Sequence, residues 1–565
     1  MFHVEPSQHR VLRVPNPTRP TSSESKQEGN ASWAKMNPMK GPPHSAELHR
    51  FPTAPNLTRR RALQTTLALA ASSVLSGCGS SVPSSGSSTS HPSNSNPQPM
   101  PSGPITDASL AVTSTVAGSI GAAFAGLSYE KSSVIESPYL FTASNSNLVG
   151  MFQRLGSSIL RIGGNSVDRN TWTPNGSGQT TGQIAPSDVN ALAAFVKAAG
   201  WQCLYGINLG GAGPDPYTSG SITAATTPAL AAGEVAYAAS QFGSSLLGIE
   251  MGNECDLYGS SYFSSTAWSL SAFETLWAQF RAAIVAQTPG VNVTGPADAG
   301  SESSWTVPFG QWATRTNITL LTQHYYRENG ESASSTAANL ITPDSTLVSD
   351  LAALNSGAKG IGIPFRLSEC NSYYNGGADG VSDAYCSSLW IIDFLFDNAL
   401  NGSAGTNFHG GGNGDGYTPI ADSGGAVIEA RPEYYGILFF TLAGQGTLYT
   451  TSLSGIGSLN VTAYAVKTTE GGLNLVIVNR DSTQNLQLTA QLPLAASTAT
   501  LLLLTQLSSG ATGPNLSATS GVTIQGASVG ANGSFTPGAA YTLTPGGVQV
   551  TFYVPALSAV LVQIS

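Results

Sequence analysis

The stretch Leu246–Glu254, LLGIEMGNE, decides the fold that we expect for this chain. It is an apolar run with the character of a buried strand, and it ends in Gly-Asn-Glu, so it delivers a carboxylate where the strand leaves its sheet. A second stretch of the same design, Ile363–Glu369 (IPFRLSE), also ends in a glutamate. Chemistry in barrel folds sits at such strand ends, so two glutamates there suit paired-carboxylate chemistry.

On both sides of these stretches, short apolar segments alternate with helical patterns. The segments that we predict as strands are 124–129, 158–162, 202–209, 246–251, 291–295, 318–325, 364–367 and 406–409. The predicted helices are 146–155, 186–199, 228–242, 269–287, 305–315, 344–356, 383–400 and 433–442. A doubly wound open sheet is the alternative, but it requires a Gly-rich phosphate turn after the first strand, where this chain has GLSYEK. The alternation therefore predicts an α/β fold, a (β/α)8 TIM barrel over residues 105–445.

The helical period ends after Ala443, and short apolar runs follow with Gly, Ser, Asn and Pro between them. This pattern predicts a C-terminal antiparallel β-sandwich over residues 446–565. The segment LAVTST (110–115) precedes the barrel and is predicted to add a strand to that sandwich.

Length and charge exclude some functions. The chain has 565 residues and a net charge of −9, which indicates two folded domains and excludes a nucleic-acid partner. Charged residues make up only 10% of the sequence, a composition typical of exported proteins.

Residues 58–80, TRRRALQTTLALAASSVLSGCGS, predict an export signal, with a basic start, an apolar stretch and small residues before Cys78. Leu75–Cys78 resembles a bacterial lipobox, in which the cysteine becomes lipidated. The alternative is an ordinary cleaved signal with an incidental cysteine. We therefore expect residues 1–78 to be an N-terminal extension with a lipoprotein-type signal and the Ser/Pro-rich residues 79–104 to be a flexible linker. The expected location is periplasmic or at the cell surface, with membrane contact only through the lipid.

The remaining cysteines are Cys203, Cys255, Cys370 and Cys386, and they show no C-x-x-C spacing. This spacing argues against a zinc site, and the scarcity of histidines after the linker argues against a histidine-built metal centre. Export permits a disulfide, but the default interpretation is small buried thiols. We predict neither a metal nor a cofactor.

The two glutamates can hydrolyse a glycosidic bond. That reaction needs one carboxyl group to protonate the leaving oxygen and another to attack or to activate water, because the transition state is cationic at the sugar ring. Glu254 and Glu369 supply this pair at the ends of the fourth and seventh predicted strands. A lone Asn-Glu is more often a structural ion pair, but the paired placement on a counted barrel favours catalysis.

Six segments resemble glycoside hydrolase family 79, the β-glucuronidases and heparanase-like enzymes within a clan of retaining barrel glycosidases. They are GLSYEKS (126–132), RIGGNSVDR (161–169), GIEMGNECDLY (248–258), QHYY (323–326), RLSECNSYYNGG (366–377) and NFHGGGNGDGYTPI (407–420). They extend from the first predicted strand to the last, and the trailing sandwich fits the second domain of that family.

The resemblance implies roles for individual residues. Glu254 becomes the acid/base, Glu369 the nucleophile, and Asn253 the partner of the sugar 2-hydroxyl. The family holds the uronic carboxylate largely with tyrosine hydroxyls and backbone N–H groups, and the counterparts here are Tyr325, Tyr374 and Tyr417, with Tyr325 also a candidate to touch the nucleophile. Neutral donors suit this task, since a buried cation beside the catalytic acids lowers a carboxyl pKa.

Two further residues are candidates for binding sugar hydroxyls. Glu130 ends the first predicted strand, and Asn165 follows the second. A local ion pair among Glu130, Lys131 and Asp168 is the alternative interpretation.

These inferences predict a retaining exo-β-glucuronidase that removes terminal β-linked glucuronic acid, including 4-O-methylated units, from a glycan without a cofactor. One alternative is a barrel glycosidase for neutral sugars, such as a β-xylosidase or β-glucosidase. Another is a non-catalytic surface lipoprotein that binds carbohydrate. Endo-action on a sulfated chain is disfavoured because the sequence has no Lys/Arg cluster to meet it.

Overall fold

The computed structural model describes residues 96–300, 302–414, 416–507 and 512–565. The predicted signal, Cys78 and residues 79–95 of the predicted linker lie outside these ranges. Among the residues that are described, no helix is both long and apolar enough to cross a membrane.

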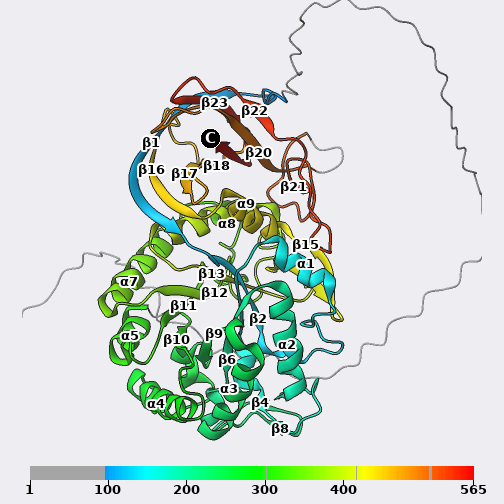
Figure 1. Cartoon of the computed structure of the whole chain (residues 1–565), viewed down its shortest axis with the longest axis vertical. Helices are drawn as coiled ribbons and strands as arrows, with labels where there is room; N and C mark the ends of the chain where they lie inside the picture. The colour runs from blue at the N-terminus through cyan, green and yellow to red at the C-terminus, as the bar shows by residue number, and fades with distance from the viewer. Residues whose placement is uncertain (1–95, 301, 415, 508–511) are drawn as a thin grey trace, which may run out of the picture. The chain divides into compact units, whose positions relative to one another are not determined.

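Eight parallel strands close into a barrel, with β13 pairing β2 to complete the ring (Figure 1). Each strand overlaps one of the eight strands predicted from the sequence, so the (β/α)8 prediction is confirmed. In chain order the strands are β2 (Ala125–Glu130), β3 (Ile159–Gly163), β6 (Gln202–Ile207), β9 (Leu246–Met251), β10 (Val293–Asp298), β11 (Leu320–Tyr326), β12 (Phe365–Asn371) and β13 (Thr406–Gly410).

Helices surround these strands in Figure 1, and local capping sets the bounds of some of them. For example, the Asp188 carboxylate accepts the Ala185 N–H at the start of one helix, and Gly200 ends that helix at φ 71°. The helices are α1 (Ser146–Arg154), α2 (Pro186–Ala199), α3 (Pro228–Phe242), α4 (Leu270–Gln287), α5 (Val307–Ala313), α6 (Ala337–Leu340), α7 (Ser345–Ile361), α8 (Tyr385–Leu400) and α9 (Pro432–Ala443).

Three short strand pairs lie outside the ring of eight barrel strands. They are β4 (Thr171–Trp172) with β5 (Gln183–Ile184), β7 (Thr218–Ser219) with β8 (Ile222–Thr223), and β14 (Ile420–Ser423) with β15 (Ala426–Ala430).

The second domain is a ten-stranded, mostly antiparallel sheet. It includes β1 (Ile105–Ile120), which precedes the barrel, so the strand expected at 110–115 is confirmed; β1 pairs β16 antiparallel and β19 parallel. The other strands are β16 (Gly446–Ser454), β17 (Val461–Thr468), β18 (Leu473–Asn479), β19 (Asn485–Gln491), β20 (Ala499–Gln506), β21 (Val522–Ile524), β22 (Tyr541–Leu543), β23 (Gln549–Val554) and β24 (Ser558–Ile564).

Alternation along β18 divides its side chains between two cores. Leu475 and Ile477 pack into the core of the sheet, whereas Val476 and Val478 join the large apolar cluster that contains the barrel helices. Successive strand residues point to opposite faces, so one face closes the sheet domain and the other covers the barrel. Residues 96–104 of the predicted linker also lie on this sheet, where Gln98 exchanges two hydrogen bonds of 2.8 Å with the backbone of Tyr553.

Polar contacts join the two domains at Asp393 of α8. Its Oδ1 accepts hydrogen bonds from Thr462 (2.5 Å) and from the Tyr464 hydroxyl (2.7 Å), and its Oδ2 pairs with Arg480. The Tyr464 ring stacks on Phe396, with centroids 4.1 Å apart. The barrel and the sheet therefore share a buried, hydrogen-bonded interface.

Candidate active site

The barrel brings the two predicted catalytic glutamates together. Glu254 follows β9 and Glu369 lies within β12, and one oxygen of each lies within 4.8 Å of the other and of a ring nitrogen of His324. Glu369 is buried, whereas the Glu254 side chain is 21% exposed. One carboxylate is therefore enclosed and the other is partly exposed to solvent.

Glu254 adopts a left-handed backbone conformation, with φ 52° and ψ 52°. This conformation costs a non-glycine residue about 1–2 kcal/mol. The Glu254 N–H donates to the carbonyl oxygen of Ala297 at 2.8 Å, which ties the turn to the end of β10. This strain is held at the residue whose carboxylate points toward Glu369, as is common at functional sites.

Both oxygens of Glu369 accept a strong hydrogen bond. Arg161 Nη1 donates to Oε2 at 2.5 Å, and the Tyr326 hydroxyl donates to Oε1 at 2.8 Å. Burial by itself raises the pKa of Glu369, but His409, His324, Arg161 and the Tyr326 hydrogen bond together hold that pKa below its ordinary value. Glu369 is therefore an ionised carboxylate in the working pH range.

Arg161, on β3, is fully buried and joins three groups of the site. Its Nε donates to Glu250 at 2.7 Å, its Nη1 to Glu369, and its Nη2 to the Asn253 side-chain oxygen at 3.0 Å. Its pKa is raised because the two carboxylates outweigh the effect of burial. The sequence interpretation gave Arg161 no role and expected no buried cation here. A charge at an interior strand position is the signal that would have found it.

Glu254 lies among other titratable groups. His324 Nδ1 is 3.2 Å from its Oε1, and the Asp256 carboxylate nearby accepts the backbone N–H of Ala299 at 3.0 Å. Burial raises the pKa of Asp256 to about 6; the hydrogen bond from Ala299 opposes this rise and the negative charge of Glu254 adds to it. A carboxyl group with a raised pKa, that of Asp256, therefore lies beside Glu254.

Asn253 is buried between two charged residues. Its side-chain oxygen accepts from Arg161, and its backbone N–H donates to Asp168 Oδ2 at 3.3 Å. Because the oxygen is already used, the side-chain NH2 is the group that remains to donate to a ligand.

The structure places Tyr326 at Glu369, a contact for which the sequence interpretation had named Tyr325 as a candidate. The Tyr325 hydroxyl donates to Asp344 at 2.6 Å, at the start of α7, and its ring packs against Phe394 of α8. Neighbouring strand residues face opposite ways, so His324 and Tyr326 share the inner face and Tyr325 points outward. The expected contact of Tyr325 with the nucleophile is therefore wrong.

Tyr417 joins the site from the loop after β13. Its ring centroid is 5.8 Å from that of Tyr326 and 6.1 Å from that of His409. Burial and the negative charge of Glu369 raise its pKa, so it is a neutral donor. Tyr374 is half-buried in the loop after β12, and its backbone N–H donates to the Glu328 carbonyl oxygen; within the described ranges its hydroxyl makes no hydrogen bond to either glutamate.

Glu130 ends β2 and holds the loop that follows β3. It accepts backbone N–H bonds from Asn165 (3.1 Å) and Ser166 (2.8 Å), and its Oε1 is 3.8 Å from His409 Nε2. Gly164 has φ 71°, and a Cβ there would lie 2.4 Å from the Glu130 carboxyl carbon, so only glycine permits this approach.

The side chains near Glu130 do not form the local ion pair considered as an alternative. The Asn165 side chain is exposed. Lys131 pairs with Glu234 at 2.6 Å, and Asp168 accepts from the Tyr258 hydroxyl at 2.5 Å.

Glu254, His324 and Glu369 are close enough to ligate a cation. Both oxygens of Glu369 already accept hydrogen bonds, from Arg161 and from Tyr326, and these bonds compete with a cation for the carboxylate. The four cysteines of the described ranges, Cys203, Cys255, Cys370 and Cys386, are free and buried, which confirms the thiol interpretation.

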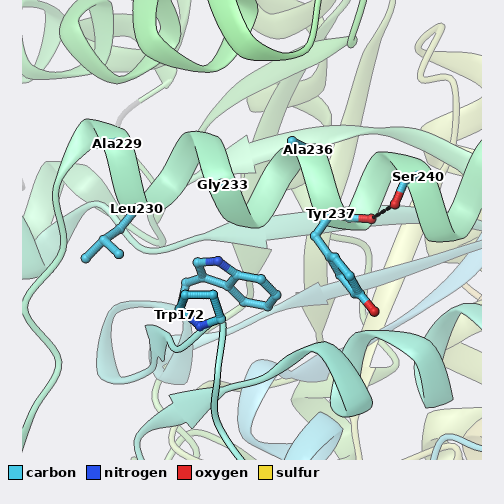
Figure 2. A pocket seen from close by; sticks show the side chains of 8 residues that line it. Trp172, Ala229, Leu230, Gly233, Ala236, Tyr237 and Ser240 are labelled. Atoms are coloured by element: carbon cyan, nitrogen blue, oxygen red, sulfur yellow. Dashed lines mark hydrogen bonds between the residues drawn. The ribbon is translucent and has the colours of Figure 1, made fainter.

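Figure 2 shows a surface hollow beside α3, in which the Trp172 ring lies near Leu230 and Tyr237. None of the catalytic candidates lines it. Its lining is formed by Trp172, Pro174, Ala229, Leu230, Gly233, Ala236, Tyr237 and Ser240.

Comparisons with known proteins agree with this architecture. No family model matches the sequence. A β-glucuronidase of Aspergillus niger is 25% identical over 312 residues, which cover 49% of this chain and 55% of that protein. The chain thus matches only about half the length of this curated relative.

Solved structures share the fold. A 4-O-α-L-rhamnosyl-β-D-glucuronidase of Fusarium oxysporum 12S has a TM-score of 0.64 at 20% identity, with 80% of this chain and 99% of that one covered. An α-L-arabinofuranosidase of Thermotoga maritima has a TM-score of 0.58 at 13% identity, with 81% and 99% covered. These likenesses establish the class of fold, a TIM barrel joined to a β-sheet domain as found in glycoside hydrolases.

Proposed function

We propose that the chain is a glycoside hydrolase that removes terminal β-linked glucuronic acid with retention of configuration. The observation that supports this mechanism best is the approach of Glu254 and Glu369, whose nearest oxygens lie within 4.8 Å. Retaining enzymes hold their carboxyl groups roughly 5–5.5 Å apart, whereas inverting enzymes leave roughly 6.5–9.5 Å for a water molecule.

In the first step, a Glu369 oxygen attacks the anomeric carbon while Glu254 protonates the leaving oxygen. Glu369 suits attack because its lowered pKa keeps it ionised, and Glu254 suits proton transfer because its side chain is partly open to the incoming group. In the second step, Glu254 takes a proton from water as the water oxygen bonds to the anomeric carbon and releases Glu369. The Asn253 NH2 group would bind the 2-hydroxyl.

The substrate carboxylate would be held by neutral donors, with Tyr417 and Tyr374 as the candidates. Arg161 is fully engaged by Glu250, Asn253 and Glu369, so it is not free to bind the sugar. The names of the Aspergillus and Fusarium proteins support glucuronic acid as the substrate.

A panel of aryl β-glycosides that differ only at C6 tests the substrate. The glucuronide carries a carboxylate, the glucoside a hydroxymethyl group and the xyloside a hydrogen. We expect the glucuronide to have the highest kcat/KM, and Tyr417→Phe to lose about tenfold to a hundredfold on it alone, since a hydrogen bond to a charged group contributes roughly 1.5–3 kcal/mol. Preference for the glucoside or xyloside would favour the neutral-sugar enzyme, and no release from any would favour the binding protein.

We also propose that the protein is exported as a lipoprotein through Cys78, a prediction that rests on sequence. Wild-type protein expressed in a bacterial host should incorporate a fatty-acid label and partition into detergent, and Cys78→Ser should do neither. Absence of label from the wild type would contradict the lipid anchor.

A further inference from the structure

Glu250 is a buried carboxylate that the mechanism above does not use. It lies on β9, four residues before Glu254, and is fully buried. Its Oε2 accepts from Arg161 Nε at 2.7 Å, while its Oε1 is buried and has no hydrogen-bond partner among the residues that the structure describes. Burying an ionised group in this way is costly unless a cation balances it, and Arg161 is that cation.

Arg161 is shared between two carboxylates. Its Nε binds Glu250 at 2.7 Å, and its Nη1 binds Glu369 at 2.5 Å. Both pairs are buried, so their electrostatic interactions are only weakly screened by solvent. Each carboxylate therefore reduces the net positive field that the guanidinium presents to the other.

We propose that Glu250 is a positioning residue that controls how strongly Arg161 holds the Glu369 carboxylate. This inference rests on the proposed function, since it assigns Glu369 as the nucleophile. Glu250 touches neither the substrate nor the reacting atoms and acts only through Arg161.

The two steps of the reaction respond to this control in opposite directions. If Glu250 loses its negative charge, the positive charge of Arg161 acts on Glu369 without that opposing charge. The Glu369 carboxylate then becomes less basic. A less basic carboxylate attacks the anomeric carbon more slowly, but it leaves that carbon faster once the glycosyl-enzyme has formed. A structural defect would instead slow both steps.

The test uses 2-deoxy-2-fluoro-β-glucuronyl fluoride to separate the steps. In trapping, a Glu369 oxygen bonds to the anomeric carbon and fluoride leaves with the bonding electrons. In recovery, the water oxygen bonds to that carbon, Glu254 takes the proton, and the bond to Glu369 breaks. Inactivation kinetics report the first step, and the return of activity after excess probe is removed reports the second.

The informative variant is Glu250→Gln, which keeps the size of the side chain and an oxygen to accept from Arg161. We expect trapping to slow by roughly threefold to tenfold and recovery to accelerate by a similar factor, because a neighbouring charge shifts a carboxyl pKa by about one unit or more. Unchanged rates, or rates that both fall, would overturn the proposal.

Glu234→Gln is the matched control, because Glu234 also forms a buried pair, with Lys131 at 2.6 Å, outside the catalytic set. Both rates should stay within about twofold of wild type. If Glu250→Gln does not fold, Glu250→Asp replaces it, and its shorter side chain should give the same opposite shifts at smaller amplitude; parallel shifts would count against the proposal.

Failure of the proposed substrate remains distinguishable. If the wild type is labelled at Glu369 by the 2-fluoro glucosyl or xylosyl fluoride but not by the glucuronyl probe, the glucuronidase assignment fails and the same variants are compared with the reactive probe. If no probe labels Glu369, both the nucleophile and the role of Glu250 are rejected.

Discussion

Two neighbouring tyrosines show how much of this site depends on single positions. Tyr326 donates to Glu369 at 2.8 Å, whereas Tyr325 donates to Asp344 at 2.6 Å on the outside of the same strand. The two side chains have the same chemistry, and only the alternation of the strand separates their roles.

Replacing Tyr326 with Phe should therefore lower kcat/KM by about tenfold to a hundredfold on glucuronide, glucoside and xyloside alike. The change removes a hydrogen bond to a charged group, worth roughly 1.5–3 kcal/mol, from the proposed nucleophile itself. Tyr325→Phe is the control, and its kcat/KM should change less than threefold. A Tyr326→Phe enzyme with wild-type kinetics would remove Tyr326 from the account.

Sequence reasoning located Glu254 and Glu369 because each ends an apolar strand, and parallel strands end at the same edge of a sheet. It missed the roles of Arg161, His409 and Tyr326, whose partners lie on other strands, although the charge of Arg161 at an interior strand position was a local signal. Tyr326 was within reach, since the alternation that puts His324 inside also puts Tyr326 inside. The sharing of Arg161 by Glu250 and Glu369 could not be predicted from the sequence, because it depends on strands that only the closed barrel brings together.

At the scale of elements, Asp168 connects the loops that follow three barrel strands. It lies in the segment after β3, its Oδ1 accepts the N–H groups of Leu209 and Gly210 after β6, and its Oδ2 accepts from Asn253 and Tyr258 after β9. Burial raises its pKa, and these hydrogen bonds oppose the rise. Asp168 thereby fixes the turn that carries Glu254.

Asp168→Asn should lower kcat about tenfold more on substrates with poor leaving groups than on activated ones. A poor leaving group needs a proton from Glu254 to depart, and a displaced Glu254 cannot deliver it. Asp188→Asn is a close control, since Asp188 is also buried and accepts from a tyrosine and two backbone N–H groups at α2. The Asp188→Asn variant should have a lower melting temperature, but its kcat should depend on the leaving group as that of the wild type does. Equal leaving-group profiles for both variants would contradict this role.

Helix α9 contains a buried carboxyl group whose ionisation opposes folding. Burial raises the pKa of Glu433 to about 8 from 4.5, although the Asn371 hydrogen bond and Arg431 lower it. A carboxyl whose folded pKa is raised holds its proton better when folded, so its contribution to stability falls as pH rises from about 4.5 to 8.

The melting temperature of wild type should therefore decline more between pH 5 and pH 8 than that of Glu433→Gln, measured by thermal unfolding in matched buffers. The difference between the two proteins should be greatest at the alkaline end. Parallel curves across this interval would show that Glu433 does not titrate there.

At the scale of the whole described chain, a barrel and a sheet share one interface centred on Asp393. Arg480 at this interface is buried, so it depends on Asp393 for its balancing charge. The β1 strand also links the two domains covalently, because the chain enters the sheet before it forms the barrel and returns to the sheet afterwards.

Asp393→Ala should lower the free energy of unfolding by about 3–5 kcal/mol, because it leaves a buried cation without its partner. Thr462→Val removes one hydrogen bond to the same carboxylate and should cost about 1 kcal/mol. Denaturant unfolding of the two variants measures both values. A loss no larger for Asp393→Ala than for Thr462→Val would mean that the ion pair does not stabilise the interface.

The most direct test of the central claim is chemical rescue of Glu369→Gly on an aryl β-glucuronide. Turnover should fall by about 10⁴-fold or more, and azide should restore part of it by attacking from the space that Glu369 vacates. The rescued product should be the α-configured glucuronyl azide, identified by NMR. Undiminished turnover without azide, or a rescued product with β configuration, would contradict the assignment of Glu369 as the nucleophile of a retaining enzyme.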